Sequence, residues 1–142
     1  MTRLAHSWFG LLGAATLLAL AAFAFDPRGR ELLRDAPAAD EITLAAARAH
    51  RGPLLWIDAR ATADFARDHI PEALPLNPDD WESQIVPVLT RWQPGTRVIV
   101  YCDDRACGSS RAVADKLRRE YQFDDVAILH GGWAAWQKAV GP

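Results

Sequence analysis

Residues 97–108 are RVIVYCDDRACG, and this stretch decides the fold class of the 142-residue chain. Its first part, Arg97–Tyr101, is rich in β-branched residues and predicts a buried strand. The chain turns polar after Cys102, and either Ser109 or Ser110 is a suitable residue to begin a helix. A strand, a short loop and a helix in this order are typical of a βαβ unit.

The same alternation runs from Asp40 onwards. Three further extended segments are expected at 54–58, 73–76 and 126–129, and helices at 44–50, 62–66, 81–92 and 133–140. Expected helix caps are Thr43, Thr62 and either Asp79 or Asp80, with Pro75 at a sheet edge and Pro87 kinking its helix. We therefore predict one α/β domain over residues 40–142, with a parallel sheet flanked by helices.

Cys102 directly follows the predicted strand 97–101, at the edge of the sheet where ligands bind in such folds. Loop amides and the positive end of the following helix stabilise a thiolate and lower the pKa of a cysteine below its usual value. They also form a nest for an anion. The pattern thus favours a nucleophilic cysteine with an anionic substrate, although a buried structural cysteine fits the same position.

Several motifs in this chain resemble those of rhodanese-like domains. They lie in family order over about residues 40–138 and comprise Leu55–Arg60, Phe65, His69–Ala73, Val98–Cys102, Phe123, Val126, Leu129, Gly131–Trp133, Ala135 and Trp136. The resemblance implies a rhodanese-like fold with a central parallel sheet. It also implies that Asp58, Arg60 and His69 support the neighbouring loops through hydrogen bonds.

The resemblance further implies a sulfurtransferase. Cys102 would take a sulfur atom from a small donor such as thiosulfate, hold it as a persulfide and pass it to a thiol or to cyanide. No cofactor is needed. The implied substrate-binding loop comprises Asp103, Asp104, Arg105, Ala106, Gly108, Ser109, Ser110 and Arg111.

This chain departs from the family pattern in its loop, which is about two residues longer and lacks an arginine before Ser110. Arg105 and Arg111 supply positive charge from other positions, whereas Asp103 and Asp104 oppose both the thiolate and a dianionic donor. Elsewhere, glycines of the family are replaced by Asp68, Glu72 and Gln122. Each replacement costs ~1 kcal/mol if its position requires a positive φ.

The role of the second thiol, Cys107, has three alternatives. It can resolve a persulfide or a sulfenate on Cys102, pair with Cys102 in a disulfide, or pack as a small residue. The chain is accordingly a sulfurtransferase, a thiol-redox protein using the Cys102/Cys107 pair, or a catalytically silent rhodanese-like binding module.

The front of the chain is apolar. After a short tail at residues 1–7, the segment Trp8–Phe25 carries no charge and would span roughly 27 Å as a helix, close to the ~30 Å hydrocarbon core of a bilayer. We expect a single-pass membrane anchor, a linker at residues 26–39 and an extracytoplasmic domain near an unknown membrane partner. Ala22-Phe23-Ala24 leaves a cleaved signal peptide as the alternative.

Composition excludes two other function classes. Sixteen basic and eighteen acidic residues give a net charge of −2, which does not predict nucleic-acid binding. The four histidines and two cysteines lack the spacing of metal ligands, so no metal site is expected.

Overall fold

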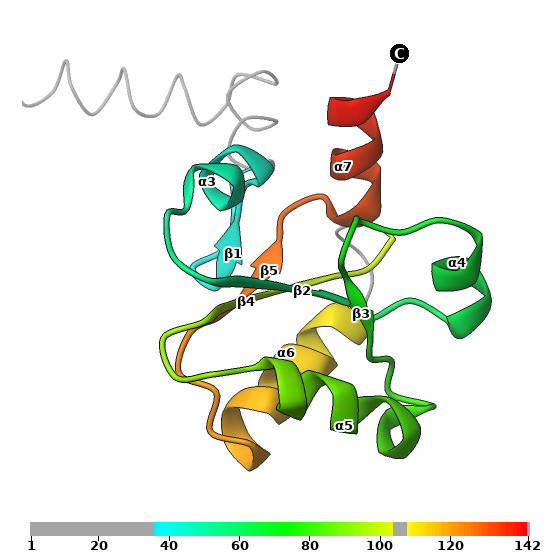
Figure 1. Cartoon of the computed structure of the whole chain (residues 1–142). Coiled ribbons are helices and arrows are strands. Elements are labelled where there is room, and N and C mark those ends of the chain that lie inside the picture. The colour runs from blue at the N-terminus through cyan, green and yellow to red at the C-terminus, as the bar shows by residue number, and fades with distance from the viewer. Residues whose placement is uncertain (1–35, 104–107, 142) are drawn as a thin grey trace, which may run out of the picture. The chain divides into compact units, whose positions relative to one another are not determined.

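A computed structural model describes residues 36–103 and 108–141 of the chain. Five parallel strands form one sheet in the order β1-β5-β4-β2-β3 (Figure 1). The strands are β1 (Glu41–Ile42), β2 (Leu54–Asp58), β3 (Leu74–Pro75), β4 (Arg97–Tyr101) and β5 (Val126–Leu129). Strand β4 lies at the centre, so the residues that follow it emerge at the middle of the carboxyl edge of the sheet.

Helices cover both faces of this sheet (Figure 1). They are α3 (Leu44–Ala49), α4 (Thr62–Arg67), α5 (Trp81–Arg91), α6 (Gly108–Glu120) and α7 (Gly132–Val140). Helices α5 and α6 pack on one face and contribute to one apolar cluster. Helices α3 and α7 pack on the other face, where α4 also contributes to a second cluster.

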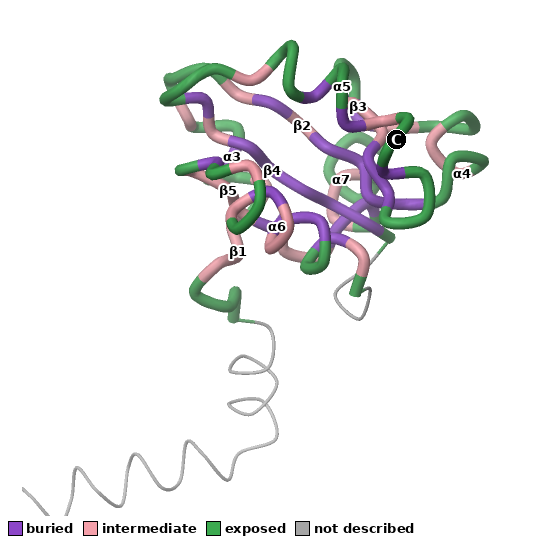
Figure 2. The backbone as a smooth tube through the Cα atoms, turned by 90° about the horizontal axis from the view of Figure 1, so that it is seen from below, coloured by how far each residue is buried: buried purple, intermediate pink, exposed green. Residues whose placement is uncertain are grey.

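Strand β4 supplies side chains to both clusters, because successive residues of a strand point to opposite faces. Val98, Val100 and Cys102 belong to the cluster with α5 and α6. Ile99 and Tyr101 belong to the cluster with α3 and α7. All five are almost inaccessible to solvent, and β4 forms part of the buried centre of the sheet (Figure 2). The backbone around Cys102 is therefore anchored from both sides.

The fold confirms the predicted α/β class, the parallel sheet and the three predicted strands that became β2, β4 and β5. Thr43 caps α3 as expected, since its hydroxyl accepts a hydrogen bond from the Ala46 N–H. Strand β1 was not predicted from sequence, because two residues carry no period and their extended form depends on pairing with β5.

Two predicted caps differ from the structure. Thr62 lies inside α4, whose N-cap is Ala61, because the Thr62 hydroxyl donates to the Asp80 carboxylate at 2.6 Å instead. Asp80 is the N-cap of α5, but its side chain does not cap the helix. The Asn77 side chain accepts from the Asp79 and Asp80 N–H groups and fixes this turn. The helix continues past Pro87 to Arg91.

Two of the three residues that replace family glycines have backbone dihedral angles in the left-handed region. Glu72 has φ 65° and Gln122 has φ 57°, whereas Asp68 is extended with φ −168°. We expect Glu72→Gly and Gln122→Gly each to raise the free energy of unfolding by about 0.5–1 kcal/mol, because glycine adopts a positive φ without strain. Urea denaturation measures this change. Asp68→Gly is the control and should not stabilise; equal stabilisation by all three would contradict the account.

The segments 1–7 and Trp8–Phe25, and most of the linker at 26–39, lie outside the described residues. Within residues 36–103 and 108–141, no helix has the length and hydropathy needed to cross a membrane.

Candidate functional site

The backbone of Cys102 is held by the first turn of α7. The Trp133 N–H donates to the Cys102 carbonyl at 2.6 Å, and the Ala134 N–H donates to the Asp103 carbonyl at 3.1 Å. Gly132 makes this approach possible: it has φ 55°, and a Cβ atom on it would lie 2.2 Å from the Cys102 oxygen. The glycine pair at 131–132 thus fixes the position of the segment that carries the predicted nucleophile.

The side chain of Cys102 lies in the core next to α6 and is 1% exposed. Its sulfur is disulfide-bonded in this structure. The loop residues Asp104, Arg105, Ala106 and Cys107 lie outside the described residues, and so does most of the predicted amide nest. A thiolate at Cys102 therefore requires reduction of the disulfide first.

Arg60 and Asp58 form a buried ion pair beside this strand end. Their side chains are 3% and 0% exposed, and the Arg60 guanidinium donates to both carboxylate oxygens, with the shortest contact at 2.7 Å. A further bond at 2.7 Å runs from Arg60 to the backbone carbonyl of Asp68. The pair therefore ties the end of β2 to the loop after α4, as the sequence resemblance implies.

The Arg60 guanidinium also lies over two aromatic rings, at 4.6 Å from the Trp133 ring centre and 5.7 Å from that of Tyr101. It lies 3.9 Å from the carboxylate of Asp103, whose side chain is 64% exposed. Burial alone would lower the pKa of Arg60, but the hydrogen bonds and charge of Asp58 more than offset this and raise it. Arg60 is thus a permanent positive charge next to the segment 102–103.

Tyr101 and His69 complete the support of this edge. The Tyr101 hydroxyl accepts a hydrogen bond from the Ile70 N–H at 3.1 Å, and burial raises the pKa of this phenol far above its usual value. His69 Nδ1 lies 2.9 Å from the Phe65 carbonyl, and its ring stacks on that of Phe65. Both side chains are engaged in holding loops.

The predicted loop residues that begin α6 are divided between core and surface. Ser110 is buried, whereas Gly108 is exposed and Ser109 is half-buried. The Arg111 guanidinium lies beside the beginning of β1, at 2.7 Å from the Asp40 carboxylate and 3.5 Å from that of Glu41. Its guanidinium is therefore shared between two carboxylates of this segment.

Sequence reasoning missed a pair between Glu41 and His130, which lie at the ends of β1 and β5. The His130 Nδ1 atom is 2.7 Å from the Glu41 carboxylate, and the Ala38 N–H donates to the same oxygen. Burial alone would raise the pKa of Glu41, but these hydrogen bonds and the charges of His130 and Arg111 hold it below the ordinary 4.5. Only the pairing of β1 with β5 brings the two side chains together.

This arrangement predicts a pH dependence of stability. Because the pKa of Glu41 is lower in the folded chain, its contribution is fully present above about pH 4.5 and is lost as pH falls through the folded value. We expect Glu41→Gln to lower the free energy of unfolding by up to ~1 kcal/mol at pH 7, with the difference shrinking as the pH falls below 4.5. Urea denaturation across this range tests it; a difference that grows on acidification would contradict the sign.

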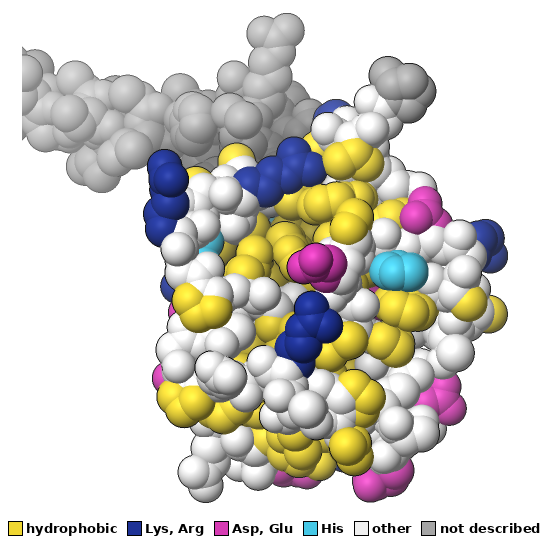
Figure 3. Space-filling model, in the orientation of Figure 1, with side chains coloured by type: hydrophobic (Ala, Val, Ile, Leu, Met, Phe, Trp, Pro, Cys, Tyr) yellow, Lys and Arg dark blue, Asp and Glu magenta, His cyan; other side chains and the backbone are white. Residues whose placement is uncertain are grey.

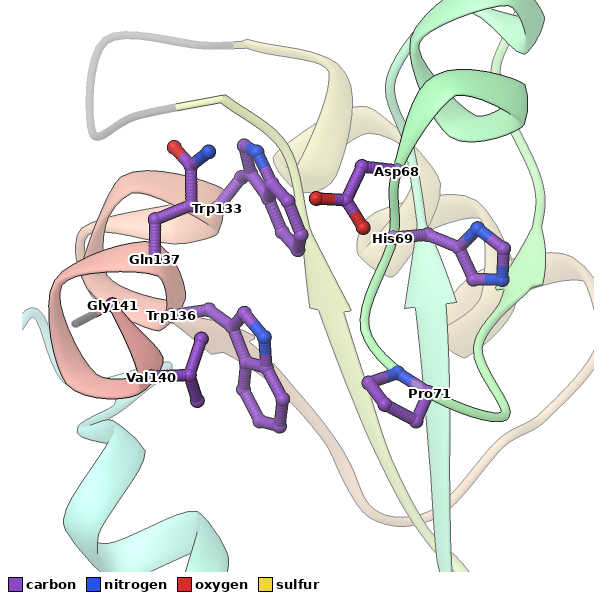
Figure 4. Close-up of a pocket in the computed structure, with 8 residues that line it drawn as sticks. All are labelled: Asp68, His69, Pro71, Trp133, Trp136, Gln137, Val140 and Gly141. Carbon is purple, nitrogen blue, oxygen red and sulfur yellow. The ribbon is translucent and has the colours of Figure 1, made fainter.

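A groove of about 420 Å³ opens beside this site, between α7 and the segment 68–71 (Figure 4). Trp133 and Trp136 line one side, and Asp68, His69 and Pro71 line the other. Figure 3 shows hydrophobic side chains gathered in a hollow on this face, with acidic, basic and histidine side chains around them. Within the described residues, no cluster of His, Cys, Asp and Glu side chains is arranged to hold a metal ion.

Residues 41–139 match the model of the family described as the rhodanese-like domain. The chain belongs to this family. Family membership confirms the resemblance of the sequence motifs and agrees with the parallel sheet, but the family includes active sulfurtransferases and silent modules alike.

Several solved structures are similar to this chain in fold. The BH2092 protein from Bacillus halodurans is 23% identical with a TM-score of 0.58, over 71% of this chain and 73% of that chain. The rhodanese-like domain of the Alr3790 protein from Anabaena sp. is 25% identical with a TM-score of 0.50, over 66% and 82%. A rhodanese-like domain protein from Staphylococcus aureus is 22% identical with a TM-score of 0.52, over 68% and 90%.

Proposed function

We propose that the reduced chain is a rhodanese-type sulfurtransferase with Cys102 as nucleophile and sulfur carrier. One observation carries the proposal: in a member of this family, Cys102 directly follows the central strand β4, with its carbonyl bonded by α7 and the positive charge of Arg60 beside the segment 102–103. Such a charge favours a thiolate and an anionic donor. No cofactor is required.

The chemistry has two steps. The Cys102 thiolate attacks the outer sulfur of thiosulfate; the sulfur–sulfur bond of the donor breaks, and sulfite leaves with the electron pair. The outer sulfur of the resulting Cys102 persulfide is then attacked by a thiolate or by cyanide. That attack returns the Cys102 thiolate and forms a persulfide or thiocyanate. From the sequence, backbone amides of the loop from Asp103 to Gly108 are expected to stabilise the charge of the persulfide.

The test is sulfite release from thiosulfate by the full chain, with cyanide as acceptor. The disulfide at Cys102 must be opened first by an added reductant, which is then removed. We expect sulfite release only after reduction. A reduced chain that turns over neither thiosulfate nor polysulfide would show a silent binding module, the outcome that the exposed carboxylate of Asp103 favours.

A thiol-redox function is the second candidate, and the disulfide at Cys102 favours it. Cys107 is the only other cysteine of the chain, so it is the only partner within one molecule. In this reaction two substrate thiols are oxidised to a disulfide, while the Cys102–Cys107 disulfide takes up two electrons and two protons. Cys107→Ser distinguishes the candidates, because it removes redox cycling but leaves persulfide formation on Cys102 intact.

We also infer from sequence that the domain is anchored in a membrane through Trp8–Phe25, on the extracytoplasmic side. The uncharged length of this segment and the flanking Arg3 and Arg28 support the inference. After a carbonate wash, the full chain should stay in the membrane pellet. Recovery of a soluble native protein that begins near Phe25 would establish a cleaved signal peptide instead.

A further inference from the structure

The groove between α7 and the segment 68–71 has aromatic walls. Trp133 and Trp136 come from α7, and Pro71 lies opposite Trp136 (Figure 4). Apolar walls of this kind bind the carbon body of a small organic molecule. An indole face in addition attracts a positively charged group.

One wall of the groove is hydrogen-bonded to the backbone of Cys102. Trp133 lines the groove with its side chain, and its N–H donates to the Cys102 carbonyl at 2.6 Å. The groove therefore adjoins the backbone of Cys102, whereas the side chain of Cys102 packs with α5 and α6 on the other face of the sheet.

The groove also holds a carboxylate with no cation paired to it. Asp68 is exposed, and its carboxylate points into the groove towards Trp133, whereas the ring of His69 points away (Figure 4). Arg60 donates to the backbone oxygen of Asp68, but its ion pairs are with Asp58 and Asp103 rather than with the Asp68 carboxylate. Among the described residues, no ion pair or hydrogen bond engages the Asp68 carboxylate.

The ring of Trp136, which forms one wall of the groove, already contacts a cation in this chain. The guanidinium of Arg48 from α3 lies 4.8 Å from its ring centre. Arg48 is exposed, so its charge is screened by solvent. Arg48 adds positive charge near one wall, whereas Asp68 places a negative charge in the groove itself. The groove prefers a cation over an anion if the charge of Asp68 outweighs that of Arg48.

We propose that this groove binds a small organic cation: an ammonium group pairs with Asp68, and the carbon body packs on Trp133 and Trp136.

The test is binding of small probes to the full chain, followed through the indole N–H resonances of Trp133 and Trp136. Benzylamine, benzyl alcohol and phenylacetate share one ring and differ in charge. We expect benzylamine to bind about five-fold more tightly than benzyl alcohol at low salt, and phenylacetate most weakly. Asp68→Asn should abolish the preference, and Asp124→Asn, a change of an exposed carboxylate before β5, should preserve it.

Equal binding of the three probes, or a preference for phenylacetate set by Arg48, would overturn the proposal. Cation binding by a chain that forms no persulfide would contradict the sulfurtransferase function and leave the groove assignment standing.

Discussion

Replacing Arg60 by methionine is expected to lower the free energy of unfolding by about 3–5 kcal/mol, because it leaves a buried carboxylate without its partner. Asp58 is 0% exposed, and its carboxylate accepts hydrogen bonds from the guanidinium and the backbone N–H of Arg60, with a further side-chain hydrogen bond to Tyr101. The same substitution removes the bond to the Asp68 carbonyl and the contact with Trp133. Urea denaturation of the full chain measures the change.

Arg111→Met is the matched control. Arg111 is 51% exposed, and its ion pairs with Asp40 and Glu41 should be worth no more than ~1 kcal/mol. If Arg60→Met does not fold, Arg60→Lys keeps the charge but loses the bidentate geometry, and a loss of about 1–2 kcal/mol is expected. Equal effects of Arg60→Met and Arg111→Met would show that the buried pair is not the support of this edge.

Replacing Cys102 by serine is expected to reduce sulfur transfer from thiosulfate by more than roughly 10³-fold, because a hydroxyl is not ionised near pH 7 and cannot carry a sulfur atom. The main fold should survive, since the Cys102 backbone is held through its carbonyl by Trp133. Initial rates of sulfite release measure the effect.

Cys107→Ser is the control for this second prediction. It changes the only other thiol of the chain and should retain sulfur transfer once the protein is reduced. If Cys107→Ser and Cys102→Ser abolish transfer equally, then the two thiols act as a pair and the redox function is favoured.

The sheet could be predicted because its central strands have strong local patterns. Arg97–Tyr101 and Val126–Leu129 are apolar runs of the length of a buried strand, and both are strands in the structure with the same bounds. Elements that depend on distant contacts were missed or misjudged. Glu41–Ile42 becomes a strand only beside β5, and Thr62 bonds Asp80 rather than its own helix.

The cysteine of the site could be predicted from the strand before it, and the supporting residues Asp58, Arg60 and His69 from the family resemblance. A cysteine after a strand is visible in the sequence. The contact of the Arg60 guanidinium with the Trp133 ring is not, because it joins segments far apart in the chain. The sequence marks Asp68 only as a residue that replaces a glycine of the family. Its place in the groove depends on how the loop after α4 approaches α7, and a sequence pattern does not encode that distance.

The central claim is that Cys102 carries sulfur, and intact-mass spectrometry tests it most directly. The full chain is reduced, freed of reductant, exposed to thiosulfate and weighed, and the modified residue is located by peptide mapping. The account predicts a gain of about 32 Da, one sulfur atom, on Cys102, lost on addition of a thiol acceptor. A gain that persists in Cys102→Ser, or no gain in the reduced chain with either thiosulfate or polysulfide, would contradict it.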